Sequence, residues 1–163
     1  MDPEAILAAI QQQHDRDAQP AGESERVSYL GFYLGSEVYG VPLEQLREVS
    51  RVSHLRRVPG APAGVAGLVN LRGEILCALD VRAILGLPAQ ASAESPFIVA
   101  LRGFGDPLAL IVDAIADIYS ISPNDIEAPP PTWPAERAAC FIGTARVTVG
   151  LMGLLDLARV TKV

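Results

Sequence analysis

Few side chains in this 163-residue chain could act as a nucleophile, a general base or a soft metal ligand: His14, His54, Cys77 and Cys140. A cysteine activated by a histidine is a nucleophile in many enzymes, so a Cys77–His54 pair is the catalytic possibility to weigh. Cys77, however, lies within the apolar run Ile75–Leu79, the ordinary setting of a buried and unreactive thiol. No spacing of these residues suggests a metal site, so we expect no catalytic residue, no metal and no cofactor.

Known enzyme signatures are also missing, because the chain contains no G-x-S-x-G, Walker loop, H-E-x-x-H or G-x-G-x-x-G. A net charge of −6 argues against nucleic-acid binding and against a polybasic membrane anchor. No apolar run is long enough to span a bilayer, and the acidic start differs from a signal peptide. Two distant cysteines suit a reducing compartment. We therefore expect a cytoplasmic protein without membrane insertion.

The elements that position the polar residues are mostly short β-strands, separated by Gly, Pro or Asp. The expected strands are Val27–Leu34, Val38–Pro42, Ala66–Leu71, Ile75–Leu79, Pro96–Leu101, Leu108–Val112, Ile115–Ile121 and Val147–Met152. Two short helices are also expected, one capped by Asp80 and one opened by Asp156. Many short strands with few helices are typical of an all-β barrel or sandwich.

The first 26 residues differ from the rest, so we divide the chain into residues 1–26 and a β domain of residues 27–163. Asp2 can cap a helix that has Ile6 and Ile10 on one face. We expect this short helix to be followed by a flexible lead-in, and a partly disordered tail is the alternative.

The chain also repeats itself. Gly67 precedes Asp80 by thirteen residues, and Gly143 precedes Asp156 by the same interval. Apolar residues match between these segments and between two earlier ones; the pairs include Ile75/Leu151, Leu76/Met152, Leu79/Leu155, Val41/Leu110, Leu46/Ile115 and Val49/Ile118. Two similar small barrels packed together are the simplest structure that explains the repeat.

The clearest motif is the segment Pro59–Leu85, in which Asn70-Leu71-Arg72-Gly73 has the pattern of a hairpin connection with Gly73 free to adopt a positive φ. The whole segment resembles the signature of the CheW family. Matching segments lie on both sides of it: Phe32–Gly35, Tyr39–Pro42, Leu46–Val49, Ile111–Ile118, Phe141–Gly143 and Leu154–Leu157. The resemblance covers about residues 28–162, in order and without large gaps.

This resemblance implies two intertwined five-stranded β-barrels, SH3-like or OB-like, with no catalytic activity. It implies two partners: the regulatory domain of a CheA-type histidine kinase and the cytoplasmic tip of methyl-accepting chemoreceptors. The protein would then be a chemotaxis scaffold, monomeric when free and recruited to receptor arrays at the inner face of the membrane. A pilus-motility or surface-sensing pathway is an alternative setting for the same role. An OB-like ligand-binding module is an alternative of another class.

The resemblance also associates Glu48 and Arg72 with receptor coupling. An ion pair between them could hold the groove between the barrels in one shape, or be a surface salt bridge worth about 0–1 kcal/mol. Leu46 and Ile75 match apolar positions of the receptor-facing groove, and strand alternation leaves open whether they point into the core instead. Asn70 completes the expected receptor site, although hairpin geometry alone would account for it.

A second surface is implied in the proline-rich run Ala128–Pro134. The aromatic residue of the family's kinase contact falls at Thr132 or at its neighbour Trp133. Prolines order the backbone in advance, so an exposed tryptophan here would lose little entropy on binding. The alternative is that Trp133 covers its own barrel. A basic segment, residues 51–57, could meet acidic partner surfaces or be a solvated loop.

Overall fold

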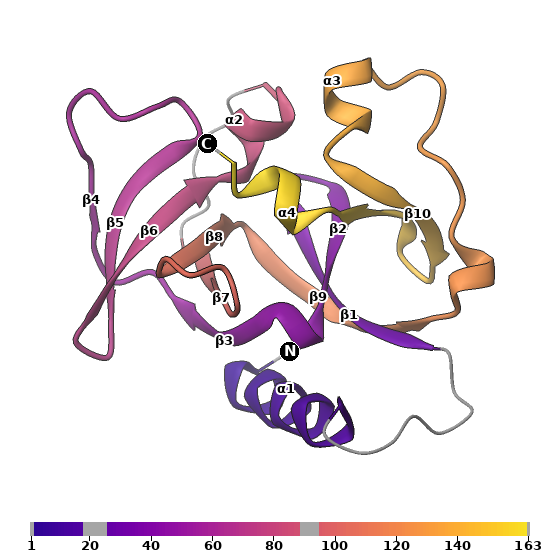
Figure 1. Cartoon of the computed structure of the whole chain (residues 1–163), viewed down its shortest axis with the longest axis horizontal. Helices are drawn as coiled ribbons and strands as arrows, with labels where there is room; N and C mark the ends of the chain where they lie inside the picture. Colours follow the sequence, from indigo (N-terminus) through magenta and orange to yellow (C-terminus); the bar gives the residue numbers. More distant parts are fainter. Residues whose placement is uncertain (1, 18–25, 89–94, 163) are drawn as a thin grey trace.

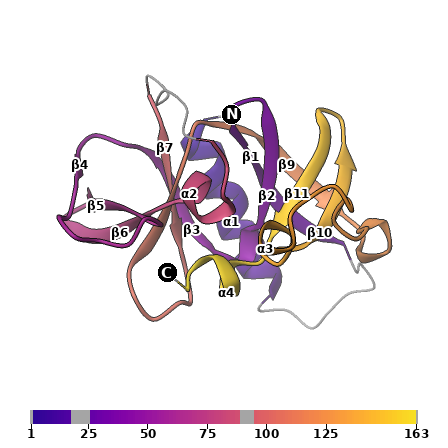
Figure 2. The same cartoon turned by 90° about the horizontal axis from the view of Figure 1, so that it is seen from above.

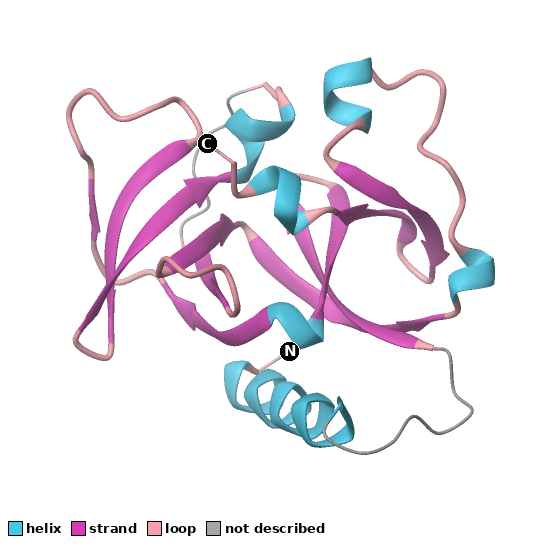
Figure 3. Ribbon diagram, in the orientation of Figure 1, coloured by secondary structure: helices cyan, strands magenta, loops and turns pink. Residues whose placement is uncertain are grey.

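The computed structural model of the chain describes residues 2–17, 26–88 and 95–162, so most of the predicted lead-in, residues 18–25, lies outside the described residues. The helices are α1 (Pro3–Asp17), α2 (Val81–Leu85), α3 (Ala135–Ala138) and α4 (Leu157–Val160), with the 3-10 turns η1 (Leu43–Gln45) and η2 (Pro123–Asp125). The strands are β1 (Val27–Leu34), β2 (Glu37–Pro42), β3 (Leu46–Arg51), β4 (Leu55–Arg56), β5 (Val65–Leu71), β6 (Glu74–Asp80), β7 (Phe97–Leu101), β8 (Leu108–Val112), β9 (Ala114–Ile121), β10 (Phe141–Val147) and β11 (Gly150–Leu155). The prediction of the all-β class is confirmed, and Figure 3 shows how short most of the helices are.

The strands form two sheets that lie side by side (Figures 1 and 2). One sheet has five strands in the order β10-β11-β2-β1-β9, and the other has six in the order β3-β7-β8-β6-β5-β4. The predicted closed barrels are not found: in the described residues no ladder joins β9 to β10 or β3 to β4. A single bridge, Glu127 with Thr144, lies near the open edge of the five-stranded sheet. Both sheets are therefore open, so any contact between their two end strands is made by side chains and not by a backbone ladder.

The predicted repeat is present, but its two copies exchange strands. The first copy supplies β1, β2, β3, β5, β6 and α2, and the second supplies β7, β8, β9, β10, β11 and α4. Antiparallel pairs β1·β9 and β3·β7 and parallel pairs β2·β11 and β6·β8 each join one copy to the other. The five-stranded sheet thus combines β1 and β2 of the first copy with β9, β10 and β11 of the second. The six-stranded sheet combines β7 and β8 of the second copy with β3, β5 and β6 of the first.

Three apolar clusters fill this arrangement. One lies within the six-stranded sheet around Leu76 and Ile98, and one within the five-stranded sheet around Tyr29 and Met152. The largest lies between the sheets and includes Phe32, together with residues from α2 and α4. Figure 1 shows α4 between the two sheets, where its buried residues join this central cluster.

The expected helix near the N-terminus is present and packs on the domain. Its first turn is capped as predicted, since Asp2 Oδ1 accepts a hydrogen bond from the backbone N–H of Glu4 at 3.3 Å. Ile6 and Ile10 are fully buried in the central cluster, and α1 lies against β3 and η1. This helix is therefore part of the core.

The local predictions for strands are confirmed with one exception. Residues 147–152, expected as a strand, instead contain the hairpin turn between β10 and β11. The apolar residues Val147, Val149 and Leu151 produced this error, because they alternate as in a strand although the chain reverses at Thr148 and Val149. Strands β3, β4 and β10 were not predicted, since charged or small residues interrupt their apolar pattern.

Candidate functional site

The structure brings together the two charged residues singled out in the sequence. Arg72 Nε donates to Glu48 Oε1 at 2.9 Å, which joins the β5–β6 hairpin to β3. The Arg72 side chain is 70% exposed, whereas that of Glu48 is 12% exposed. Glu48 is therefore the fixed member of the pair, and Arg72 presents its remaining N–H donors to solvent.

The hairpin turn explains how Arg72 reaches this position. Arg72 has φ 53° and Gly73 has φ 84°, as a two-residue type I′ turn requires. Asn70 Oδ1 accepts a hydrogen bond from the Gly73 backbone N–H at 2.9 Å. A left-handed conformation costs a non-glycine residue about 1–3 kcal/mol, so the ion pair with Glu48 helps to stabilise a strained residue.

A second ion pair, which the sequence did not predict, lies beside the first. Arg47 Nη1 contacts Glu74 Oε2 at 2.5 Å, again between β3 and the hairpin. Two adjacent residues of β3 thus bind two residues on the hairpin, across the gap where no backbone ladder closes the sheet. The signal in the sequence was alternating charge, Arg47-Glu48 against Arg72 and Glu74.

The apolar candidates separate into core and surface. Leu46 is fully buried in the central cluster, so its side chain does not reach a partner. Ile75 is 52% exposed on β6, directly opposite the exposed Asn70 in the register of the hairpin. Leu68, also exposed, lies opposite Cys77 on the same ladder. The surface beside the ion pairs therefore combines Arg72 with exposed apolar side chains.

The second predicted surface is partly buried. The Trp133 ring packs on Phe141 with centroids 4.8 Å apart, and its backbone N–H donates to Pro130 O at 3.0 Å. Thr132 is exposed beside it. A pocket of about 240 Å³ lies next to Trp133, and the exposed Val149 and Leu151 of the β10–β11 hairpin help to line it.

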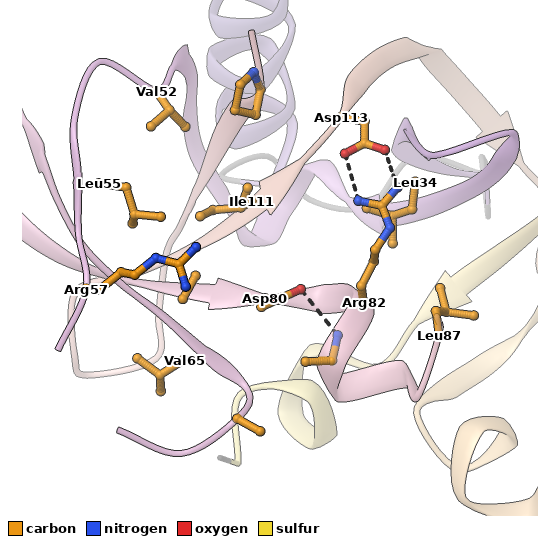
Figure 4. A pocket seen from close by; sticks show the side chains of 14 residues that line it. Leu34, Val52, Leu55, Arg57, Val65, Asp80, Arg82, Leu87, Ile111 and Asp113 are labelled. Atoms are coloured by element: carbon orange, nitrogen blue, oxygen red, sulfur yellow. Dashed lines mark hydrogen bonds and ion pairs between the residues drawn. The ribbon is translucent and has the colours of Figure 1, made fainter. Parts of the chain in front are cut away.

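A third ion pair lies where the chain passes from one sheet to the other. Arg82 of α2 forms a bidentate pair with Asp113, which separates β8 from β9; one contact, Nη1 to Oδ1, is 3.0 Å (Figure 4). Asp113 Oδ2 also accepts from the Gly35 backbone N–H at 2.7 Å. Burial alone would raise the pKa of Asp113, but the hydrogen bonds from Arg82 and Gly35 outweigh burial and hold it below its ordinary value.

The cysteines do not have the environment of a nucleophile. Burial, reinforced by the negative charge of Asp106, raises the pKa of Cys77. Burial and the charge of Asp156 likewise raise the pKa of Cys140, against the opposing effect of Arg159. A raised pKa favours the thiol over the reactive thiolate. Within the described residues, no three His, Cys, Asp or Glu side chains gather closely enough to hold a metal ion.

None of the helices that the structure describes is long and apolar enough to cross a membrane. The two open sheets and the paired charges define the class of protein: a β domain that presents an ion-paired, partly apolar hairpin surface.

Comparison with known proteins places this domain in a family. The model of the CheW-like domain matches residues 28–163. The chemotaxis protein CheW of Treponema pallidum is 29% identical over 150 residues, covering 88% of this chain and 87% of that protein. The chemotaxis protein CheW of Klebsiella aerogenes is 26% identical over 134 residues, covering 82% and 77%.

A solved structure agrees with this assignment. The scaffolding protein TtCheW from Thermoanaerobacter tengcongensis superimposes with a TM-score of 0.76 at 25% identity, covering 89% of this chain and 94% of that one. The chain therefore belongs to the CheW family, and the resemblance noted in its motifs is confirmed.

Proposed function

We propose that the protein is a non-catalytic cytoplasmic scaffold that couples chemoreceptors to a CheA-type histidine kinase in chemotaxis signalling. Its membership of a family whose relatives are chemotaxis and scaffolding proteins supports this role. The observation that carries the proposal is the Glu48–Arg72 pair, because it fixes an exposed cation beside exposed apolar residues.

The receptor surface in this proposal consists of Arg72, Ile75 and Asn70, with Glu48 and Leu46 as positioning residues. Arg72 offers free N–H donors to an acidic group of the receptor tip, and Ile75 offers apolar area. Leu46 acts from the core by holding β3, the strand that carries Glu48.

The kinase surface in this proposal is formed by Thr132 and its surroundings. Trp133 shapes the surface from below through its contact with Phe141, and Val149 and Leu151 add exposed apolar area. The two surfaces lie on different sheets, so one molecule can bind both partners at once. Several weak contacts in an array then give a stable assembly, because each raises the effective concentration for the next.

The test is binding of purified wild-type, Glu48→Lys and Thr132→Arg proteins to the receptor tip and to the kinase regulatory domain of the same organism. Glu48→Lys places like charges at the hairpin and should weaken receptor binding at least about tenfold while kinase binding is kept. Thr132→Arg should show the reverse pattern. An unchanged receptor affinity in a well-folded Glu48→Lys protein would contradict the proposal.

A charge reversal, Glu48→Arg with Arg72→Glu, separates two roles of the pair. Recovered receptor affinity in the double variant means that the pair acts only by shaping the hairpin. Continued loss means that Arg72 itself contacts the receptor. Arg146→Glu, at an exposed arginine on the other hairpin, is the control, and it should leave receptor affinity unchanged.

A further inference from the structure

A pocket of about 440 Å³ lies at the end of the β5–β6 hairpin opposite the Arg72-Gly73 turn, where Val65, Ala66 and Asp80 help to line it (Figure 4). Both sheets contribute to it, since Leu34 ends β1 and Asp113 follows β8. Ten of its fourteen lining residues are of apolar types: Leu34, Val52, Leu55, Ala63, Val65, Ala66, Ala83, Leu87, Pro96 and Ile111. This volume is in the range of small-molecule binding sites.

Four charged residues complete the lining, and two of them neutralise each other. Arg82 and Asp113 form the bidentate ion pair described above. Arg57 forms no hydrogen bond or ion pair with any residue in the described ranges, and Figure 4 shows its guanidinium directed into the pocket. Asp80 uses Oδ1 to accept from the Ala83 backbone N–H at 3.2 Å.

Arg57 and Asp80 are therefore one cation and one carboxylate outside any ion pair of the described residues, and the charge of Asp80 also acts on Arg82. Both line a pocket whose walls are polar as well as apolar. A guanidinium binds a carboxylate through paired hydrogen bonds, and the second oxygen of an aspartate suits an ammonium group. A ligand with only one charge would satisfy Arg57 or Asp80 and be repelled by the other. A ligand with both charges and an apolar body satisfies both.

We propose that this pocket binds a free apolar α-amino acid, with its carboxylate on Arg57, its ammonium group facing Asp80 and its side chain against Val52, Leu55 and Ile111. This site is independent of the proposed scaffold role and would hold whichever partners the hairpin surfaces bind. Because its walls come from both sheets, an occupied pocket would also stabilise the folded protein by mass action.

The experiment is a titration of the full chain with L-leucine and L-phenylalanine, followed by methyl and backbone NMR. Saturable shifts are expected at Val52, Leu55 and Ile111. Arg57→Gln should weaken leucine binding about tenfold or more, the effect of losing a charge-assisted hydrogen bond. Arg56→Gln is the matched control, because Arg56 is an exposed neighbour that does not line the pocket. The Arg56→Gln protein should bind leucine with the affinity of the wild type.

Two single-charge analogues test the role of each group. Leucinamide lacks the carboxylate and 4-methylpentanoate lacks the ammonium, so both should bind wild type more weakly than leucine. Asp80→Asn can still cap α2, and it should weaken leucine binding while strengthening that of 4-methylpentanoate. Ala63→Phe, which fills the exposed mouth of the pocket, should abolish the shifts.

Clear outcomes overturn the proposal. No shifts at the pocket with 10 mM leucine would exclude the site, and so would shifts of equal size in Arg57→Gln. Equal binding of leucine and of 4-methylpentanoate would exclude recognition of the ammonium group by Asp80. None of these results depends on binding of a kinase or receptor, so they leave the proposed function untouched.

Discussion

At the scale of single residues, two ion pairs of this chain lie between segments that no backbone ladder joins. The Glu48–Arg72 and Arg47–Glu74 pairs lie between β3 and the hairpin, where the sheet stays open. The partly exposed pairs contribute modestly to stability, since solvent screens them. Arg82 and Asp113 are more enclosed, with side chains 16% and 19% exposed, and their pair joins α2 to the junction between β8 and β9.

Asp113→Asn tests the pair between the sheets. Because the pKa of Asp113 is lower in the folded than in the unfolded chain, the stability that it contributes is fully present above its unfolded pKa of about 3.9. That contribution is lost as the pH falls toward the folded value. We expect the free energy of unfolding at pH 7 to fall by about 2 kcal/mol in Asp113→Asn, and by much less at pH 3. Urea unfolding at the two pH values measures both.

The control for this substitution is Asp125→Asn, an exposed residue of η2, which should change stability by less than about 0.5 kcal/mol. An equal loss at pH 7 and pH 3 in Asp113→Asn would mean that packing, and not the charge, explains the effect.

At the scale of elements, the β5–β6 and β10–β11 hairpins share a closely packed glycine. Gly67 on β5 and Gly143 on β10 both lie at a register shift of their strand pair, and both approach a neighbouring backbone closely. A Cβ at Gly67 would lie 2.2 Å from Arg56 O, and one at Gly143 would lie 2.6 Å from Glu127 O. The thirteen residues from each glycine to the aspartate that caps the following helix, Asp80 or Asp156, thus have the same structure in both copies.

Alanine at either glycine should therefore be strongly destabilising. We expect Gly67→Ala and Gly143→Ala each to lower the free energy of unfolding by about 2–4 kcal/mol, through the backbone clash and the positive φ together. Gly60→Ala separates the two causes, because Gly60 has φ 76° but open space around it, and it should cost only about 1 kcal/mol. Denaturant unfolding of the three variants measures this, and equal losses in all three would refute the clash.

Helix α1 is the other element with a clear energetic role. Ile10 is fully buried between α1 and the central cluster. Ile10→Ala should lower the free energy of unfolding by about 2–4 kcal/mol, through lost apolar burial and the cavity left behind. Gln11→Ala, exposed on the same helix, should change it by less than about 0.5 kcal/mol. Thermal unfolding compares them, and a harmless Ile10→Ala would show that α1 is not part of the cooperative unit.

At the scale of the whole molecule, strand exchange makes the two halves of the sequence interdependent. Without β7 and β8, the six-stranded sheet loses the strands that connect β3 to β6. Without β1 and β2, the five-stranded sheet loses the strands that connect β9 to β11. Neither copy of the repeat can therefore form either sheet in full by itself, although each carries a similar set of strands.

This interdependence predicts the behaviour of fragments. Residues 1–88 and residues 89–163, prepared separately, should each be unfolded by far-UV circular dichroism and by NMR dispersion. Mixed together, they should recover the spectrum of the intact protein, because the pairs β1·β9, β2·β11, β3·β7 and β6·β8 can form between chains. A folded isolated fragment would show that one copy does not need the strand pairs that it makes with the other.

Several features follow from the sequence alone: the all-β class, seven of the eight predicted strands, the caps at Asp2, Asp80 and Asp156, and the Arg72-Gly73 turn. These features depend on local chemistry: apolar alternation, capping oxygens and residues that tolerate positive φ. The family was also readable from motifs, because they are local.

Other features depend on contacts between residues distant in sequence, and these became visible only in the folded structure. The exchange of strands between copies and the Arg82–Asp113 pair both join segments far apart along the chain. The open edges, found in place of closed barrels, likewise depend on which distant strands pair. The different positions of Leu46 and Ile75 belong here too. Both are apolar residues in strands, and only the neighbouring sheet and α1 decide that Leu46 is buried while Ile75 faces solvent.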